Sequence, residues 1–134
     1  MRIDHVAMYV NDLEAEKDFF VKYFNAKAGS KYSNFRNDFS NYFLSFADGS
    51  RLEIMTRTSS ADPKKDRYRT GFHHLAICVG DRKDVDDMMK KFDADGVIVV
   101  SGARTTGDGY YEAVVVDPEG NEIEVIAEHD DFRD

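Results

Sequence analysis

The chain contains two copies of one sequence pattern, and this internal repeat constrains its fold more than any other feature. Residues 4–10 and 73–79 both read x-His-aliphatic-Ala-x-x-Val, and each is followed at once by a short polar turn. Residues 48–54 and 119–125 form a second match, because both consist of an acidic residue, Gly, two polar residues and then aliphatic-Glu-aliphatic. The histidines are 69 residues apart (5 to 74) and the glutamates 71 (53 to 124). Two independent matches at nearly one offset predict a duplicated structural unit.

Each copy has the pattern of a strand, a helix and three further strands. Apolar residues at helical spacing follow each histidine strand, and alternating runs rich in β-formers come next. Asn11 and Asp81 are the expected N-cap residues of the two helices. The predicted strands are residues 2–10, 27–32, 41–47 and 51–57, then 72–79, 97–101, 110–116 and 121–127; the predicted helices are residues 12–25 and 82–94.

These elements predict an α+β fold. Two tandem βαβββ modules would form a curved mixed sheet around a central cavity. We expect one domain over residues 1–134, built from repeats 1–58 and 71–128, with residues 59–70 as a polar linker that contains Pro63.

Four side chains are candidates for a shared metal site. Side chains alternate across a strand, so each repeat should place one His and one Glu on the sheet face opposite its aliphatic, helix-covered face. A carboxylate in such a place is costly unless it is paired or bound to metal. The repetition favours a divalent metal site made by His5, Glu53, His74 and Glu124, over the alternative that these residues face solvent or an organic ligand.

Two imidazoles and two carboxylates suit several divalent ions. Zinc or nickel comes first, and cobalt, manganese or iron(II) would also fit. Four protein ligands leave positions open on an octahedral ion, and catalysis needs open positions. The sequence does not decide whether the four ligands come from one chain or two.

Composition narrows the class of partner. The formal net charge of −8 repels nucleic-acid phosphates and anionic membranes, so we expect neither as a partner. No apolar run approaches the roughly 20 residues of a membrane span, and the single cysteine, Cys78, excludes an internal disulfide. We therefore expect a cytoplasmic protein. Because each repeat is too small for a large core, a homodimer is also expected.

The motifs resemble those of the vicinal-oxygen-chelate superfamily, also called the glyoxalase/bleomycin-resistance/dioxygenase family. The resemblance covers almost the whole chain. It rests on the early His-x-Ala, Leu52-Glu53-Ile54, Gly71-x-x-His74-x-Ala76 and Asp117-Pro118-x-Gly120-Asn121-x-Ile123-Glu124. Within the family, a His/Glu/His/Glu set is most similar to glyoxalase I, the lactoylglutathione lyase, because other metal-dependent members typically keep three protein ligands.

This resemblance implies methylglyoxal detoxification. A 2-oxoaldehyde–thiol hemithioacetal would be converted to a 2-hydroxyacyl thioester by proton transfer through a metal-bound enediolate. Glu124 would be the base and Glu53 its counterpart on the other face.

The positions that bind the thiol cofactor in glyoxalase I differ from the family pattern. Tyr9 lies where the family usually has Arg, Arg57 lies where Asn is common, and Arg104 lies where a basic residue would contact the peptide. The resemblance thus places Tyr9, Arg57 and Arg104 in the substrate site and leaves open whether the thiol is glutathione.

Two other classes of function remain. One is another metal enzyme of the superfamily, either an acyl-thioester epimerase or a dioxygenase. Retention of Glu53 argues against the dioxygenase, whose iron normally has three protein ligands. The other is a non-enzymatic small-molecule-binding or resistance protein, against which the four retained ligands argue.

Overall fold

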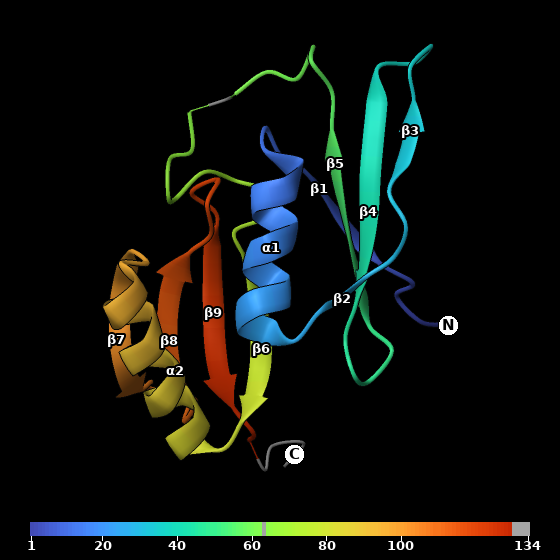
Figure 1. Cartoon of the computed structure of the whole chain (residues 1–134). Helices are drawn as coiled ribbons and strands as arrows, with labels where there is room; N and C mark the ends of the chain where they lie inside the picture. The colour runs from blue at the N-terminus through green and yellow to red at the C-terminus, as the bar shows by residue number, and fades with distance from the viewer. Residues whose placement is uncertain (63, 130–134) are drawn as a thin grey trace. The chain divides into compact units, whose positions relative to one another are not determined.

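The chain divides into two units, residues 1–64 and residues 65–134, in a computed structural model that describes residues 1–62 and 64–129 (Figure 1). Pro63, in the expected linker, lies outside the described residues. Each unit is described by itself.

Unit 1 contains one helix and one sheet. Its elements in chain order are β1 (Val6–Tyr9), α1 (Leu13–Phe24), β2 (Lys27–Ala28), β3 (Tyr32–Asn34), β4 (Phe39–Ser45) and β5 (Arg51–Thr56). The strand order is β1-β5-β4-β2, and β3 also pairs with β4. Strand β1 is parallel to β5, whereas the other pairs are antiparallel.

Unit 2 repeats this arrangement with β6 (His74–Gly80), α2 (Arg82–Asp95), β7 (Val99–Thr105), β8 (Tyr111–Val116) and β9 (Glu122–Ala127). Its strand order is β6-β9-β8-β7, again with the first strand parallel to the last. The predicted α+β fold with two βαβββ modules is confirmed, although one predicted strand of unit 1 is split into β2 and β3. The strands form two mixed sheets, one in each unit.

The outer strand explains where the strand predictions differ. The strand predicted at residues 27–32 is replaced by two short strands, β2 and β3, because the five residues from Ala28 to Tyr32 lie opposite only four on β4, from Leu44 to Asn41. The extra residue interrupts the ladder as a bulge does. Strand β7 also changes register against β8 and extends to Thr105, beyond the predicted end at residue 101.

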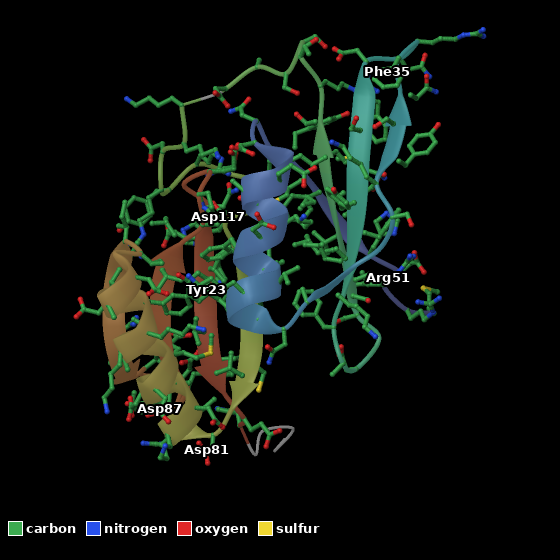
Figure 2. All side chains as sticks on the ribbon, viewed as in Figure 1. Tyr23, Phe35, Arg51, Asp81, Asp87 and Asp117 are labelled. Carbon is green, nitrogen blue, oxygen red and sulfur yellow. The ribbon has the colours of Figure 1, made fainter. Side chains whose placement is uncertain are left out.

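The two helices begin with acidic N-caps. Asp81 is the N-cap of α2, as predicted (Figure 2). Its side chain accepts a hydrogen bond from the Asp84 backbone amide, and the Asp84 side chain accepts from the Asp81 amide, which makes a capping box. At α1 the prediction of Asn11 is wrong, because Asp12 accepts from the Ala15 amide at 3.0 Å. The Asn11 amide instead donates to both oxygens of Asp62 at 3.0 Å. A carboxylate also suits the positive end of the helix dipole better than an amide does.

Each helix covers the aliphatic face of its own sheet. Helix α1 packs on β4 and β5, and α2 packs on all four strands of unit 2. Fully burying one such aliphatic or aromatic side chain contributes roughly 1.5–3 kcal/mol. The opposite sheet face is therefore left for polar side chains. The buried apolar residues include Leu13, Phe19, Phe20, Leu44, Leu52 and Ile54 in unit 1, and Val85, Phe92, Ala113, Val115, Ile123 and Val125 in unit 2. Among the described residues, no helix is long and apolar enough to cross a membrane.

Candidate metal centre

The two units place their His and Glu residues in the same register. In unit 1, Ala7 pairs with Glu53 across the parallel strands β1 and β5. In unit 2, Ala76 pairs with Glu124 across β6 and β9. Paired residues share a sheet face, and each histidine lies two residues before its alanine on that same face. Strand pairing therefore brings one His and one Glu together in each unit.

His5 and Glu53 form the pair of unit 1. The His5 Nε2 atom lies 3.5 Å from Glu53 Oε1, and the Glu53 side chain is only 14% exposed. The second carboxylate oxygen of Glu53 accepts a hydrogen bond from Asn41 Nδ2 at 2.6 Å. The Phe43 and His5 rings are nearly perpendicular, with a centroid distance of 5.2 Å. These contacts hold the carboxylate from one side and leave its other oxygen facing the imidazole.

A charged pair lies behind His5. The Asp4 Oδ2 atom is 2.8 Å from His5 Nδ1 and accepts from Arg51 Nη2 at 2.6 Å. Hydrogen bonds from His5 and from Arg51 lower the pKa of Asp4 to about 2. Asp4 is thus a carboxylate at neutral pH and acts only as an acceptor.

His74 and Glu124 form the matching pair of unit 2. The His74 Nε2 atom lies 3.2 Å from Glu124 Oε2, and the Glu124 side chain is 18% exposed. On its other side Glu124 shares a hydrogen bond with Glu112 of β8. That bond, together with burial and the charge of Glu124, raises the pKa of Glu112 from its ordinary 4.5 to about 7. Glu112 is therefore largely protonated below neutral pH and can donate to Glu124.

Asn41 and Glu112 occupy equivalent positions. Phe43 pairs with Glu53, and Asn41 lies two residues before Phe43. Val114 pairs with Glu124, and Glu112 lies two residues before Val114. Each predicted glutamate ligand thus has a polar neighbour on the adjacent strand: the amide of Asn41 beside Glu53, and the carboxylic acid of Glu112 beside Glu124.

The geometry of each pair fits two donors to one ion. Donors that bind an ion at roughly 2.1 Å lie roughly 3.0 Å apart at a right angle and roughly 3.4 Å apart at the tetrahedral angle. The observed nitrogen–oxygen distances, 3.5 and 3.2 Å, are close to these values. The structure thus brings the four predicted ligands together as two pairs, one in each unit. Within residues 1–62 and 64–129 it contains no group of three or more His, Cys, Asp or Glu side chains that could hold a metal ion. A single centre made by both pairs stays a prediction.

The three predicted substrate-binding residues form two separate groups. Arg57 Nε donates to the Tyr9 hydroxyl at 3.0 Å, and Arg57 Nη1 donates to the Asn37 carbonyl at 2.7 Å. Arg104 Nη1 donates to Ser101 Oγ at 2.8 Å. A second Arg104 nitrogen lies 3.9 Å from Glu112, and its side chain is half exposed. Tyr9 and Arg57 therefore act together in unit 1, whereas Arg104 lies beside the Glu124–Glu112 pair in unit 2.

Sequence reasoning missed the residues that hold the two pairs. Asn41, Glu112 and Asp4 were not predicted, although strand alternation places Asn41 on the Glu53 face and Glu112 on the Glu124 face. Extending the repeat comparison to the strand before each Gly turn would have aligned Asn41 with Glu112. Nothing in the sequence shows that Asp4 turns back onto His5.

Known proteins resemble this chain over almost its whole length. The sequence model of the Glyoxalase/Bleomycin resistance protein/Dioxygenase superfamily matches residues 2–125. The chain is 29% identical over 132 residues to the uncharacterized protein YqjT of Bacillus subtilis, and the alignment covers 92% of this chain and 96% of YqjT. It is 24% identical over 133 residues to the lactoylglutathione lyase of Escherichia coli O157:H7, with 99% of this chain and 97% of the lyase covered.

The fold is also shared with solved structures. A glyoxylase/bleomycin resistance protein/dioxygenase domain from Frankia sp. EAN1pec superposes with a TM-score of 0.82 at 14% identity, covering 98% of this chain and 94% of that domain. At this identity the likeness shows the fold alone, but it agrees with the match of the family model over residues 2–125. The chain belongs to the Glyoxalase/Bleomycin resistance protein/Dioxygenase superfamily.

Proposed function

We propose that this chain is a metal-dependent, glyoxalase I-like lyase. It would convert the hemithioacetal of a 2-oxoaldehyde, such as methylglyoxal, into a 2-hydroxyacyl thioester. The observation that carries the proposal is the duplicated His–Glu pair, with the same strand register and nitrogen–oxygen distances of 3.5 and 3.2 Å. The similarity to a lactoylglutathione lyase over nearly the whole chain supports it.

His5, Glu53, His74 and Glu124 would hold one divalent ion, zinc or nickel first, with cobalt, manganese or iron as alternatives. When bound, the ion would polarise the substrate carbonyl and stabilise the negative charge that develops on the two neighbouring oxygens. A homodimer remains our expectation for the assembly.

Glu124 is the proposed base. It would take the proton from the carbon that carries sulfur and return it to the adjacent carbon, so that the reaction is a redox-neutral isomerisation. Glu53 is the weaker choice, because the Asn41 amide holds one of its oxygens at 2.6 Å. The partner of Glu124 is instead the carboxylic acid of Glu112, which can give up or regain its own proton. Glu53 would serve chiefly as a ligand and would face the other side of the substrate.

The substrate would extend from the metal pair toward Arg57. Tyr9 lies four residues beyond His5 and Arg57 four residues beyond Glu53, so both are roughly 13 Å from the pair along the strands. The Arg57 guanidinium, supported by the Tyr9 hydroxyl, could hold the carboxylate of a thiol cofactor. Arg104 would offer a second positive charge. A carboxylate-bearing low-molecular-weight thiol, glutathione or another, fits this arrangement.

An acyl-thioester epimerase is the second candidate. It would use the same four ligands and move a proton beside a thioester carbonyl, and one carboxylate in each unit suits such a reaction. The superfamily to which the chain belongs also includes dioxygenases and resistance proteins, so ring cleavage and binding without reaction are the remaining candidate functions.

The test uses chelator-treated protein supplied separately with Ni, Co, Zn or Mn. Isomerisation of methylglyoxal–thiol adducts is followed with glutathione and with one alternative thiol. Glu124→Gln is the test variant, and Glu128→Gln, at an exposed position after β9, is the matched control. The proposal predicts metal-dependent turnover that only Glu124→Gln loses. Tight metal binding without turnover would exclude the lyase and favour the epimerase assay, and turnover in Glu124→Gln would exclude Glu124 as the base.

A further inference from the structure

A second, outer pair of side chains lies next to each His–Glu pair. In unit 1 it joins Asp4, the residue before His5, to Arg51, two residues before Glu53, at 2.6 Å. In unit 2 the equivalent positions are His73 and Glu122, whose side chains lie 3.4 Å apart. Both units thus have an outer pair, but the acidic and basic positions are exchanged. In unit 1 the acidic residue, Asp4, precedes the first strand, whereas in unit 2 the acidic residue, Glu122, lies on the last strand, β9.

Each outer pair contacts the Nδ1 atom of its neighbouring histidine. Asp4 Oδ2 lies 2.8 Å from His5 Nδ1, and His73 Nδ1 lies 2.7 Å from His74 Nδ1. In both units the Nε2 atom of this histidine, His5 or His74, faces the glutamate of its own His–Glu pair. The outer pairs therefore contact the nitrogen that would not bind the metal.

In unit 1 the contact fixes where the proton lies. Asp4 already accepts from Arg51 Nη2, and a carboxylate has no proton to donate to a second partner. The proton of the Asp4–His5 contact must then be on His5 Nδ1. A neutral His5 ring consequently presents a bare Nε2 toward Glu53.

In unit 2 the same result requires two steps. Arg67 Nη2 lies 3.3 Å from one oxygen of Glu122, and His73 Nε2 lies 3.4 Å from the other. The carboxylate favours a proton on His73 Nε2, which leaves His73 Nδ1 as an acceptor. His74 Nδ1 must then carry the proton between the two rings, and His74 Nε2 is bare toward Glu124.

We propose that Asp4 in unit 1 and the His73–Glu122 pair in unit 2 are positioning residues that hold His5 and His74 in the Nδ1–H tautomer, so that both present Nε2 as a metal donor. This inference rests on the proposed function for the identity of the ligands. Hydrogen bonding at the second ring nitrogen orients metal-binding histidines in proteins generally. Exposed ion pairs contribute little to stability, so the effect of these residues should fall on the ligands rather than on folding.

The first test reads the tautomers directly in the metal-free protein. Long-range proton–nitrogen NMR spectra of the imidazole rings are recorded near pH 8, where an ordinary histidine, with a pKa of roughly 6.5, is neutral. The proposal predicts Nδ1–H for His5 and His74 and Nε2–H for His73. An Nε2–H tautomer at His5 or His74 would overturn it, whatever the enzyme activity proves to be.

Matched variants then separate positioning from a structural role. Asp4→Ala and His73→Ala remove the acceptor, so the rings of His5 and His74 should return to Nε2–H and metal affinity should fall roughly 10- to 100-fold. Asp4→Asn and His73→Asn keep an acceptor oxygen near the same place and should restore the Nδ1–H tautomer and most of the affinity. Asp18→Asn, on an exposed acidic residue of α1, is the control.

The possible results are distinguishable. Wild-type tautomers in both alanine variants would overturn the inference, as would unchanged metal affinity. A wild-type protein that has the expected tautomers, binds metal and moves no proton in any thiol adduct would refute the proposed lyase while leaving the positioning role intact. Thermal unfolding of each variant shows whether it is folded as the wild type is.

Discussion

Glu112 should make the stability of the metal-free protein depend on pH. The hydrogen bond to Glu124 and the burial of the Glu112 side chain, which is 12% exposed, raise its pKa from 4.5 to about 7. In the unfolded chain Glu112 should titrate near its ordinary value. The folded state therefore binds one more proton than the unfolded state between about pH 4.5 and pH 7. The stabilising effect of that proton is complete below this window and is lost as pH rises through it.

The magnitude follows from the size of the pKa change. One pKa unit corresponds to about 1.4 kcal/mol, so the change at face value amounts to about 3 kcal/mol. Solvent near the pair reduces this figure, because it screens the interaction between the two carboxyl groups. We expect the free energy of unfolding to fall by about 1–2 kcal/mol between pH 4.5 and pH 8 because of Glu112.

Urea unfolding across this pH range, in chelator so that no metal competes for Glu124, measures the effect. Glu112→Gln is the matched variant, because it gives unit 2 an amide at the position that Asn41 occupies in unit 1. Subtracting the unfolding free energies of the variant from those of the wild type removes the contributions of distant groups. A difference that stays constant, or that rises with pH, would refute the shared proton between Glu112 and Glu124.

Three further predictions concern stability, measured by urea unfolding of each variant. Asp12→Ala should lower the unfolding free energy by about 1 kcal/mol and Asn11→Ala by less, because Asp12 caps α1; the reverse order would contradict the assignment. Asp117→Ala should cost about 2 kcal/mol, since its buried carboxylate accepts from the backbone amides of Glu119 and Asn121; a loss below about 0.5 kcal/mol would argue against this turn. Phe92→Ala should cost roughly 3–5 kcal/mol, because this residue of α2 is fully buried where the helix packs on the sheet of unit 2, and a smaller loss would place it outside the core.

The fold could be predicted from the sequence because the repeat and the two periodicities agree. Alternation in the strands and helical spacing in between specify the same order of elements in both halves. The interrupted outer strand of unit 1 could not be predicted, because it depends on one extra residue against β4. The capping residue of α1 was missed because two adjacent residues, Asn11 and Asp12, both suit an N-cap and tertiary contact with Asp62 decides between them.

The sequence predicts the two His–Glu pairs of the candidate site but not the residues that contact them. The pairing of each His with its Glu follows from register and could be predicted from the repeat. Glu112 has no repeated counterpart of the same type, because Asn41 is an amide, so the repeat comparison passed over it. The contacts of Asp4 and His73 depend on how side chains before the strands turn, which strand alternation does not specify.

Metal stoichiometry shows whether the two His–Glu pairs share one ion. Chelator-treated wild-type protein and four single variants, His5→Ala, Glu53→Ala, His74→Ala and Glu124→Ala, are titrated with Zn and with Ni by calorimetry. We expect one ion per chain in the wild type, whether the ligands come from one chain or two, and a large loss of affinity in all four variants. Two ions per chain, no tight binding, or a loss confined to the variants of one unit would contradict a single centre shared by both His–Glu pairs.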